Sequence, residues 1–299
     1  MTPFAPWPAD PVVVTRRGRP VELSVRTTPD GPGRTPALMV HGLGGSALNW
    51  TDLMGLLADR LASRAPDLPG FGLSPPPADH DYSLPAHAQA VTGLLEHDGR
   101  APVHLMGNSL GGAVATMVAA HRPDLVRSLT LISPALPDFR PGRYRTQVAL
   151  LAAPGIGAVL SRRLAALSPE QRVAGLLRLV YADPSAVDDR QRAMAVEEVA
   201  RRSRLPYATD ALASSARGLM HEFVRTGTGS LWRLAAQVTV PTLLLYGRQD
   251  RLVSSLVAPK AKAAFPHATV VVLPRSGHVA QMEQPEVVEQ LVRRLLDQA

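Results

Sequence analysis

Short apolar runs alternate along the chain with longer stretches of helical periodicity. Five apolar runs predict buried strands: 37–41, 103–106, 126–132, 242–246 and 269–273. Five helical stretches are predicted between and after them, at about 48–60, 84–98, 110–121, 254–265 and 285–296. Strands that alternate with helices predict an α/β fold in which a parallel sheet carries helices on both faces.

The alternation stops after Asp138, and only helical patterns follow until about Ala236. Within this stretch, Ser168 to Gln171 has the form of a capping box with proline at the first helical position, which predicts a helix start. We expect residues 1–136 and 237–299 to form the core domain. Residues 137–236 are predicted to form an all-helical cap over the carboxyl ends of the strands, where open α/β sheets bind ligands.

The composition fits one large α/β domain or two modest ones, since the chain has 299 residues of which 45% are apolar and 19% are charged. The longest uncharged apolar stretch, Val148 to Leu160, contains Pro154 and is well short of the ~20 residues that cross a bilayer. Its part from Leu150 to Leu160 is expected to line an acyl pocket, to associate weakly with a lipid surface, or simply to pack within the cap. The first twenty residues lack the pattern of a secretory signal, so a cytoplasmic location is expected.

The absence of cysteine excludes a thiolate nucleophile, an iron–sulfur cluster and cysteine-based zinc sites. The formal charge of +7 raises the question of a nucleic-acid partner. The arginines are scattered, however, and the longest basic clusters are pairs such as Arg16-Arg17 and Arg293-Arg294, with few aromatic residues between them. We therefore expect a solvated basic face and no nucleic-acid partner.

The strongest chemical signal is a G-x-S-x-G motif, Gly107 to Gly111, which follows a predicted strand and opens a predicted helix. A nucleophile on such a sharp turn has a strained backbone, and the glycines two residues away let the neighbouring chain pass. This setting indicates that Ser109 is a nucleophile. The alternative is a glycine-rich turn that closes an ordinary strand–helix unit.

A serine hydroxyl needs a base, and that base needs a carboxylate that holds it in one tautomer. His278 lies on the loop between the last strand and the last helix, which makes it the candidate base. Asp250 follows the strand at 242–246 and is the candidate acid, with Asp138 as the alternative. His41 is expected to support a glycine-rich loop rather than to act as a base.

Acyl transfer also requires donors where the oxyanion forms. The backbone N–H of Leu110, directly after the candidate nucleophile, is one candidate. The second is the N–H of Leu43 in the loop His41 to Gly45, for which a plain glycine turn is the alternative.

Five segments together resemble one known family over about residues 37–298: HGLGG, DLPGFGLS, GNSLGG, GRQD and SGHVAQMEQPE. They resemble the α/β-hydrolase superfamily, and within it the capped serine hydrolases of the carboxylesterase and carbon–carbon hydrolase branch. The order Ser109, Asp250, His278 is also that of this superfamily. The resemblance implies a mostly parallel eight-stranded sheet, no cofactor or metal, and a substrate pocket between core and cap.

Two residues that differ from those of some superfamily members narrow the reactions that the sequence predicts. Relatives that open epoxides or remove halides carry Asp where this chain has Ser109, and carbon–carbon hydrolases usually carry Trp where it has Val279. The sequence therefore predicts hydrolysis of a small carboxylic ester through an acyl-enzyme. The alternatives are a carbon–carbon hydrolase of ring-cleavage dienones, a cofactor-free perhydrolase or acyltransferase, and, from another class, a non-catalytic ligand-binding protein. Acyl chain length and oligomeric state do not follow from the pattern.

Overall fold

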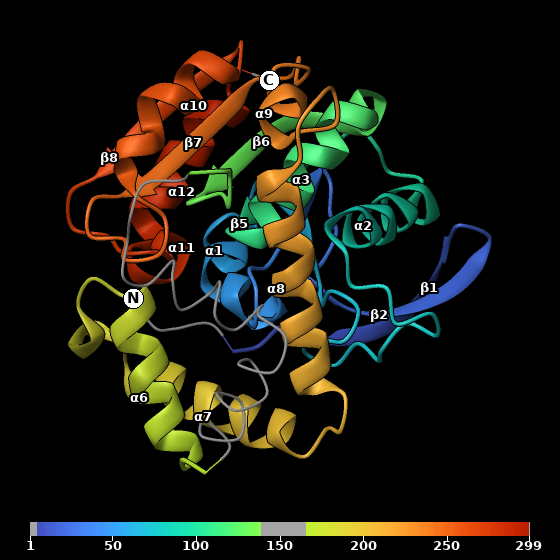
Figure 1. Cartoon of the computed structure of the whole chain (residues 1–299). Coiled ribbons are helices and arrows are strands. Elements are labelled where there is room, and N and C mark those ends of the chain that lie inside the picture. The colour runs from blue at the N-terminus through green and yellow to red at the C-terminus, as the bar shows by residue number, and fades with distance from the viewer. Residues whose placement is uncertain (1–4, 139–165, 299) are drawn as a thin grey trace.

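The computed structural model describes residues 5–138 and 166–298, and an eight-stranded sheet forms its centre (Figure 1). The strand order is β1-β2-β4-β3-β5-β6-β7-β8. The strands are β1 (Ala9–Arg16), β2 (Arg19–Thr27), β3 (Thr35–Val40), β4 (Leu61–Pro66), β5 (Val103–Asn108), β6 (Val126–Ile132), β7 (Thr242–Gly247) and β8 (Ala268–Leu273). Strands β3 to β8 pair in parallel, whereas β1 and β2 are antiparallel at one edge. The predicted mostly parallel sheet is confirmed.

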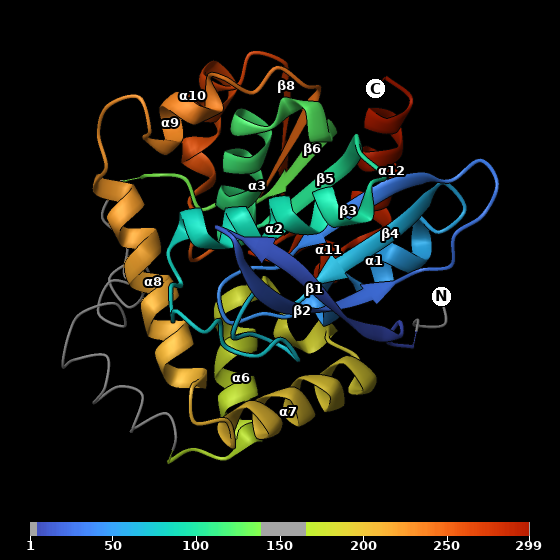
Figure 2. The same cartoon turned by 90° about the vertical axis from the view of Figure 1, so that its right-hand side faces the viewer.

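Helices cover both faces of the sheet, and each face has its own buried apolar cluster (Figure 2). One face carries α2 (Leu84–Asp98), α3 (Leu110–His121), α9 (Leu231–Ala235) and α10 (Ala258–Ala264). The other carries α1 (Thr51–Leu56), α11 (Ala280–Glu283) and α12 (Pro285–Leu296). Small apolar residues around all sides of α3 let its first ten residues lie buried beside β5, which fixes the start of this helix at the sheet.

Three further helices stand together at one end of the sheet: α6 (Pro169–Val180), α7 (Asp189–Ser203) and α8 (Ala208–Val224) (Figures 1 and 2). They lie in the chain between β6 and β7. Helix α6 begins with the capping box predicted at Ser168, whose hydroxyl accepts the Gln171 amide. The predicted cap range also includes α9, but α9 packs with the core helices on α3. The apolar stretch 150–160 lies outside the described residues.

Strands β1, β2 and β4 were not among the strands predicted from the apolar runs. The first two form a hairpin around Arg17 and Gly18, both with positive φ (49° and 74°), a turn that suits the twist of paired strands. Two predicted helices are also shorter than expected. The stretch 48–60 is a 3-10 turn (Ala47–Trp50) followed by α1, and 254–265 is a 3-10 turn (Ser255–Val257) followed by α10.

The packing of α3 against β3 predicts that Gly111→Ala strongly destabilises the fold. A Cβ at residue 111 would lie 2.2 Å from the carbonyl oxygen of Val40 and 2.5 Å from that of His41. We expect unfolding in urea to show a loss of at least ~3 kcal/mol. Gly175→Ala in α6 is the matched control, because Gly175 has open space around it and the change should add about 0.5–1 kcal/mol. Equal effects of the two substitutions would contradict this account of the packing.

Candidate active site

The G-x-S-x-G motif forms the turn between β5 and α3. Ser109 has φ 54° and ψ −118°, a conformation that a residue with a side chain rarely adopts. A Cβ at Gly107 would lie 2.3 Å from the carbonyl oxygen of Gly111, so the turn closes this tightly only because residue 107 is glycine. The sharp turn places Ser109 at the carboxyl end of β5, at the start of α3.

Asp250 and His278 form a buried pair on the loops that follow β7 and β8. The Nδ1–H of His278 donates to Oδ2 of Asp250 at 2.8 Å, and the two side chains are 6% and 0% exposed. The other carboxylate oxygen, Oδ1, accepts the backbone amides of Leu252 and Val253 at 2.7 and 2.9 Å. Burial works to raise the pKa of Asp250, but the charge and hydrogen bond of His278, together with the Val253 amide, outweigh it and lower that pKa. The carboxylate is thus kept charged and is held in one orientation.

Close contacts bring the loops after β3, β5, β7 and β8 together. The side-chain amide of Asn108, directly before Ser109, donates to the carbonyl oxygen of His278 at 3.0 Å. A Cβ at Gly42 would lie 3.1 Å from the Cβ of Ser109, so the glycine-rich loop after β3 touches the turn. A Cβ at Gly247 would lie 2.0 Å from the carbonyl oxygen of Gly277, so the loops after β7 and β8 are equally close. The candidate nucleophile, base and acid therefore come from loops in mutual contact.

The two backbone amides predicted to bind an oxyanion lie on two of these loops. Leu110 is the first residue of α3, where an amide has no acceptor within its own helix. Leu43 follows Gly42, the residue that packs against Ser109. Both amides thus belong to the backbone that surrounds the turn.

A comparison with protein families supports the fold. The model of the family described as alpha/beta hydrolase fold matches residues 35–285. The chain belongs to the α/β-hydrolase family. The family expected from the five sequence segments is therefore confirmed.

Relatives of this α/β-hydrolase carry several chemistries. It is 31% identical over 264 residues to the dihydrolipoyllysine-residue acetyltransferase component of the acetoin cleaving system of Pseudomonas putida, with 87% of this chain and 63% of that protein covered. It is 27% identical to a 2-hydroxy-6-oxononadienedioate/2-hydroxy-6-oxononatrienedioate hydrolase of Cupriavidus pinatubonensis (93% and 92% covered). The structure of a thermophilic esterase from Thermogutta terrifontis matches with a TM-score of 0.73 at 26% identity, covering 97% of this chain and 99% of that one.

A buried polar network supports the glycine-rich loop of this α/β-hydrolase. Nε2 of His41 accepts the amide of Leu68 at 2.9 Å, so the ring proton is on Nδ1, which lies 2.8 Å from the carbonyl oxygen of Gly42. Burial lowers the pKa of His41 to about 4, which keeps the ring neutral. The carboxylate of Asp67 accepts the amides of Ala47 and Leu73 and so ties the loop after β3 to the loop after β4.

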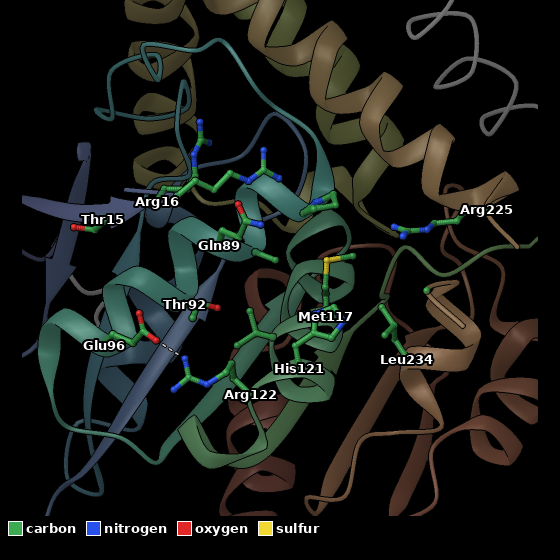
Figure 3. A pocket seen from close by; sticks show the side chains of 15 residues that line it. Thr15, Arg16, Gln89, Thr92, Glu96, Met117, His121, Arg122, Arg225 and Leu234 are labelled. Atoms are coloured by element: carbon green, nitrogen blue, oxygen red, sulfur yellow. Dashed lines mark hydrogen bonds and ion pairs between the residues drawn. The ribbon is translucent and has the colours of Figure 1, made fainter. Parts of the chain in front are cut away.

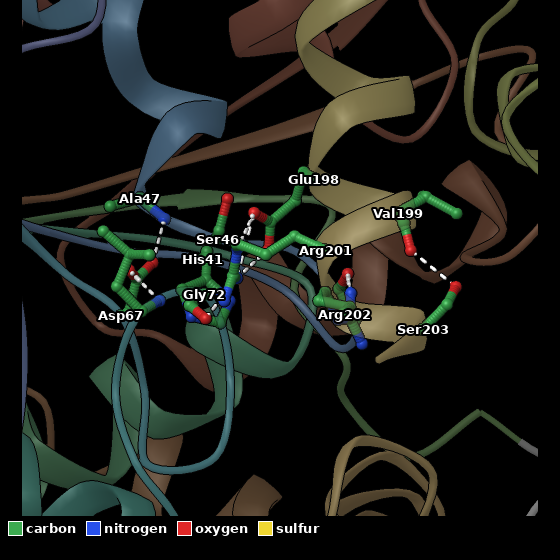
Figure 4. A network of polar contacts seen from close by, with 12 residues as sticks. His41, Ser46, Ala47, Asp67, Gly72, Glu198, Val199, Arg201, Arg202 and Ser203 are labelled. Atoms are coloured by element: carbon green, nitrogen blue, oxygen red, sulfur yellow. Dashed lines mark hydrogen bonds and ion pairs between the residues drawn. The ribbon is translucent and has the colours of Figure 1, made fainter. Parts of the chain in front are cut away.

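Two arginines of α7 reach from the helical insert to these same loops (Figure 4). Arg201 pairs with Glu198 and donates to the carbonyl oxygen of Gly72, whereas Arg202 donates to that of Gly44 and lies over the ring of Phe71. Helix α7 is thus fastened directly to the glycine-rich loop that follows β3.

Sequence reasoning assigned no role to Asn108, Asp67 or Glu283, although each lies in a segment that carried the family resemblance. Each acts through a side-chain contact to a backbone group distant in sequence. A polar residue inside an otherwise apolar or glycine-rich segment was the signal available for all three.

A surface groove beside α2 and α3 lies apart from this candidate site. This groove of about 470 Å³ is lined by β1, α2, α3 and the connection from α8 to α9 (Figure 3). Its arginines already have acidic partners: Arg16 pairs with Asp79, and Arg122 pairs with Glu96 and Asp124. The groove therefore offers little unpaired charge to a ligand.

Within the described residues, no cluster of three or more His, Asp or Glu side chains is suited to a metal ion. Likewise, no helix between residues 5 and 138 or between 166 and 298 has the length and hydropathy of a membrane span.

Proposed function

We propose that this α/β-hydrolase cleaves a small carboxylic ester through an acyl-enzyme on Ser109. The observation that carries the proposal is the buried hydrogen bond between His278 and Asp250, on loops that contact the strained turn at Ser109. A histidine held by a carboxylate in this way presents its Nε2 as a base. The kinship to an esterase of known structure supports the choice of ester.

In the proposed reaction, Nε2 of His278 removes the proton from the Ser109 hydroxyl as its oxygen attacks the ester carbonyl carbon. The amides of Leu43 and Leu110 donate to the oxyanion, each stabilising the transition state by roughly 3 kcal/mol. His278 then gives the proton to the departing alcohol, and the C–O bond to the alcohol breaks. Water, deprotonated by His278 in the same way, then attacks the carbonyl carbon of the acyl-serine, and the acid is released as Ser109 regains its proton. Asp250 keeps the imidazole in the required tautomer and stabilises its charged form.

We also propose that the helical insert is a cap over this site. Helix α7 reaches the glycine-rich loop through Arg202, and α6 ends at the loop that carries His278. Of the described residues, the cap would comprise α6 to α8, while α9 packs with the core.

A second candidate is hydrolysis of a carbon–carbon bond in a dienone. It is favoured by the relative named for a 2-hydroxy-6-oxononadienedioate substrate, which this chain matches over 93% of its length. An acyl-transfer role, suggested by the acetyltransferase relative, would use the same groups with an alcohol in place of water.

A substrate panel distinguishes these reactions. p-Nitrophenyl esters from acetate to palmitate are assayed beside one ring-cleavage dienone, with and without an added alcohol, and His278→Ala is the control. We expect release of p-nitrophenol from at least one ester, at a rate at least ~1000-fold above that of His278→Ala, and no loss of dienone absorbance. Turnover of the dienone without ester cleavage would overturn the assignment to esters.

A further inference from the structure

The Glu283 side chain joins the loop that carries His278 to the end of α6. Its Oε1 accepts the backbone amide of Gly277 at 2.8 Å, and its Oε2 accepts that of Ala182 at 2.7 Å. Gly277 is the residue before His278, and Ala182 lies two residues beyond the end of α6. One carboxylate thus holds two backbone segments that are about a hundred residues apart in the chain.

Three other contacts fasten the same two segments. The backbone amide of His278 donates to the carbonyl oxygen of Val180 at 2.7 Å. A Cβ at Gly277 would lie 2.6 Å from that same oxygen, so only glycine permits this approach. Val279, the residue after His278, is buried in a cluster with Leu177 and other residues of the insert. Every residue from 277 to 279 therefore contacts the end of α6.

The loop that carries Asp250 also contacts the end of α6. Arg251, directly after Asp250, donates from Nη1 to the carbonyl oxygens of Arg178 and Tyr181. These are carbonyls of the last turn of α6, which lack partners within the helix. The end of α6 therefore contacts both the Asp250 loop and the His278 loop.

We propose that Glu283 is a positioning residue for His278, which fixes the backbone around the base against the end of α6. This inference rests on the proposed function, in which His278 is the base. Glu283 itself does not touch the reacting atoms. Its effect is to hold the imidazole at the angle that lets Nδ1 reach Asp250 while Nε2 faces the nucleophile.

The chemistry of the site explains why a carboxylate is needed there. Two amide donors converge on one side chain, and a carboxylate offers an acceptor oxygen to each. Glutamine offers one oxygen and one NH₂ group, so one amide would face another donor. Burial raises the pKa of Glu283, and the amides of Ala182 and Gly277 oppose that rise because they bind the charged form.

The test compares Glu283→Gln with Glu286→Gln in the full chain. Glu286 lies in the first turn of α12, is exposed, and gives the same change of charge three residues away. For Glu283→Gln we expect kcat on the best ester to fall about 10- to 100-fold, as for a small misplacement of a catalytic group, with KM within about three-fold of wild type. Glu286→Gln should match wild type in both constants.

A spectroscopic readout makes the test independent of the ester. The His278 Nδ1–H that donates to Asp250 should give a far-downfield proton resonance, assigned by its loss in His278→Ala. We expect this resonance to broaden or vanish in Glu283→Gln and to persist in Glu286→Gln. If wild type cleaves no ester, the proposed function fails, while the resonance still decides the role of Glu283.

Ala182→Pro provides a second variant if Glu283→Gln does not fold. It replaces the amide donor on the insert with the proline Cδ, which displaces the Glu283 carboxylate that accepts that amide. Tyr181 already has the extended backbone that a following proline requires (φ −94°, ψ 146°). The same loss of kcat and of the resonance supports the proposal. If the resonance and kcat stay as in wild type in whichever of the two variants folds, the proposal is overturned.

Discussion

Asp250→Asn is expected to lower kcat on the best ester by about 10⁴-fold, because it reverses the tautomer of His278. The oxygen Oδ1 is fixed by the amides of Leu252 and Val253, so asparagine would keep its carbonyl oxygen there. Its NH₂ group would then face Nδ1 of His278 and donate to it. The ring proton would move to Nε2, which could no longer accept the proton of Ser109.

Steady-state kinetics on purified variants measure this effect, with Asp138→Asn as the control. Asp138 is the alternative acid that the sequence leaves open, whereas in the structure Nδ1–H of His278 donates to Asp250. We expect Asp138→Asn to keep kcat within about three-fold of wild type. Collapse of turnover in Asp138→Asn, with activity retained in Asp250→Asn, would show that Asp250 is not the acid that orients His278.

The free energy of unfolding should fall steeply as the pH drops from about 6.5 towards 4. Burial lowers the pKa of His41 to about 4 and that of His87 to about 3, from an ordinary value near 6.5. Between these values the unfolded chain binds protons that the folded chain excludes, so acid favours unfolding. Each histidine then costs up to ~1.4 kcal/mol of stability per pH unit, or about 3 kcal/mol over the window. The buried carboxyl of Asp67, whose pKa is raised by burial, offsets part of this loss.

Urea unfolding at several pH values tests the prediction, with His87→Gln as the diagnostic variant. His87 lies in α2, and its Nε2 is 3.0 Å from the hydroxyl of Ser215 in α8. Removing its titration should flatten the slope of stability against pH by about 1.4 kcal/mol per unit. His267→Gln, at an exposed position, should leave the slope unchanged. A protein whose stability is constant or rises between pH 6.5 and 4.5 would contradict this reading of the buried histidines.

The strands that could be predicted are those whose sequences are mainly apolar. The run at 242–246, in which four of five residues are apolar, becomes β7, buried at every position. In β2 the buried apolar residues are Val21, Leu23 and Val25, which alternate with polar residues, and β4 carries Arg64 within a short stretch. The sequences of the edge hairpin and of β4 therefore gave a weaker strand signal than those of the central parallel strands.

The candidate site shows a similar limit. Ser109 and His278 could be predicted because they lie in glycine-rich motifs with a fixed local geometry. The role of Glu283 depends on two amides, at 182 and 277, that become neighbours only when the insert folds back onto the core. Local sequence patterns do not show which distant segments come into contact, so a positioning residue of this kind could be identified only from the three-dimensional structure.

The most direct test of the central claim is to find the acyl group on the protein. Wild type is mixed with excess p-nitrophenyl butyrate, quenched in acid within the first turnovers, digested and analysed by mass spectrometry. We expect one butyryl group on the peptide that contains Ser109, and none in Ser109→Ala. An acyl group on another residue, or equal acylation of Ser109→Ala, would contradict the account.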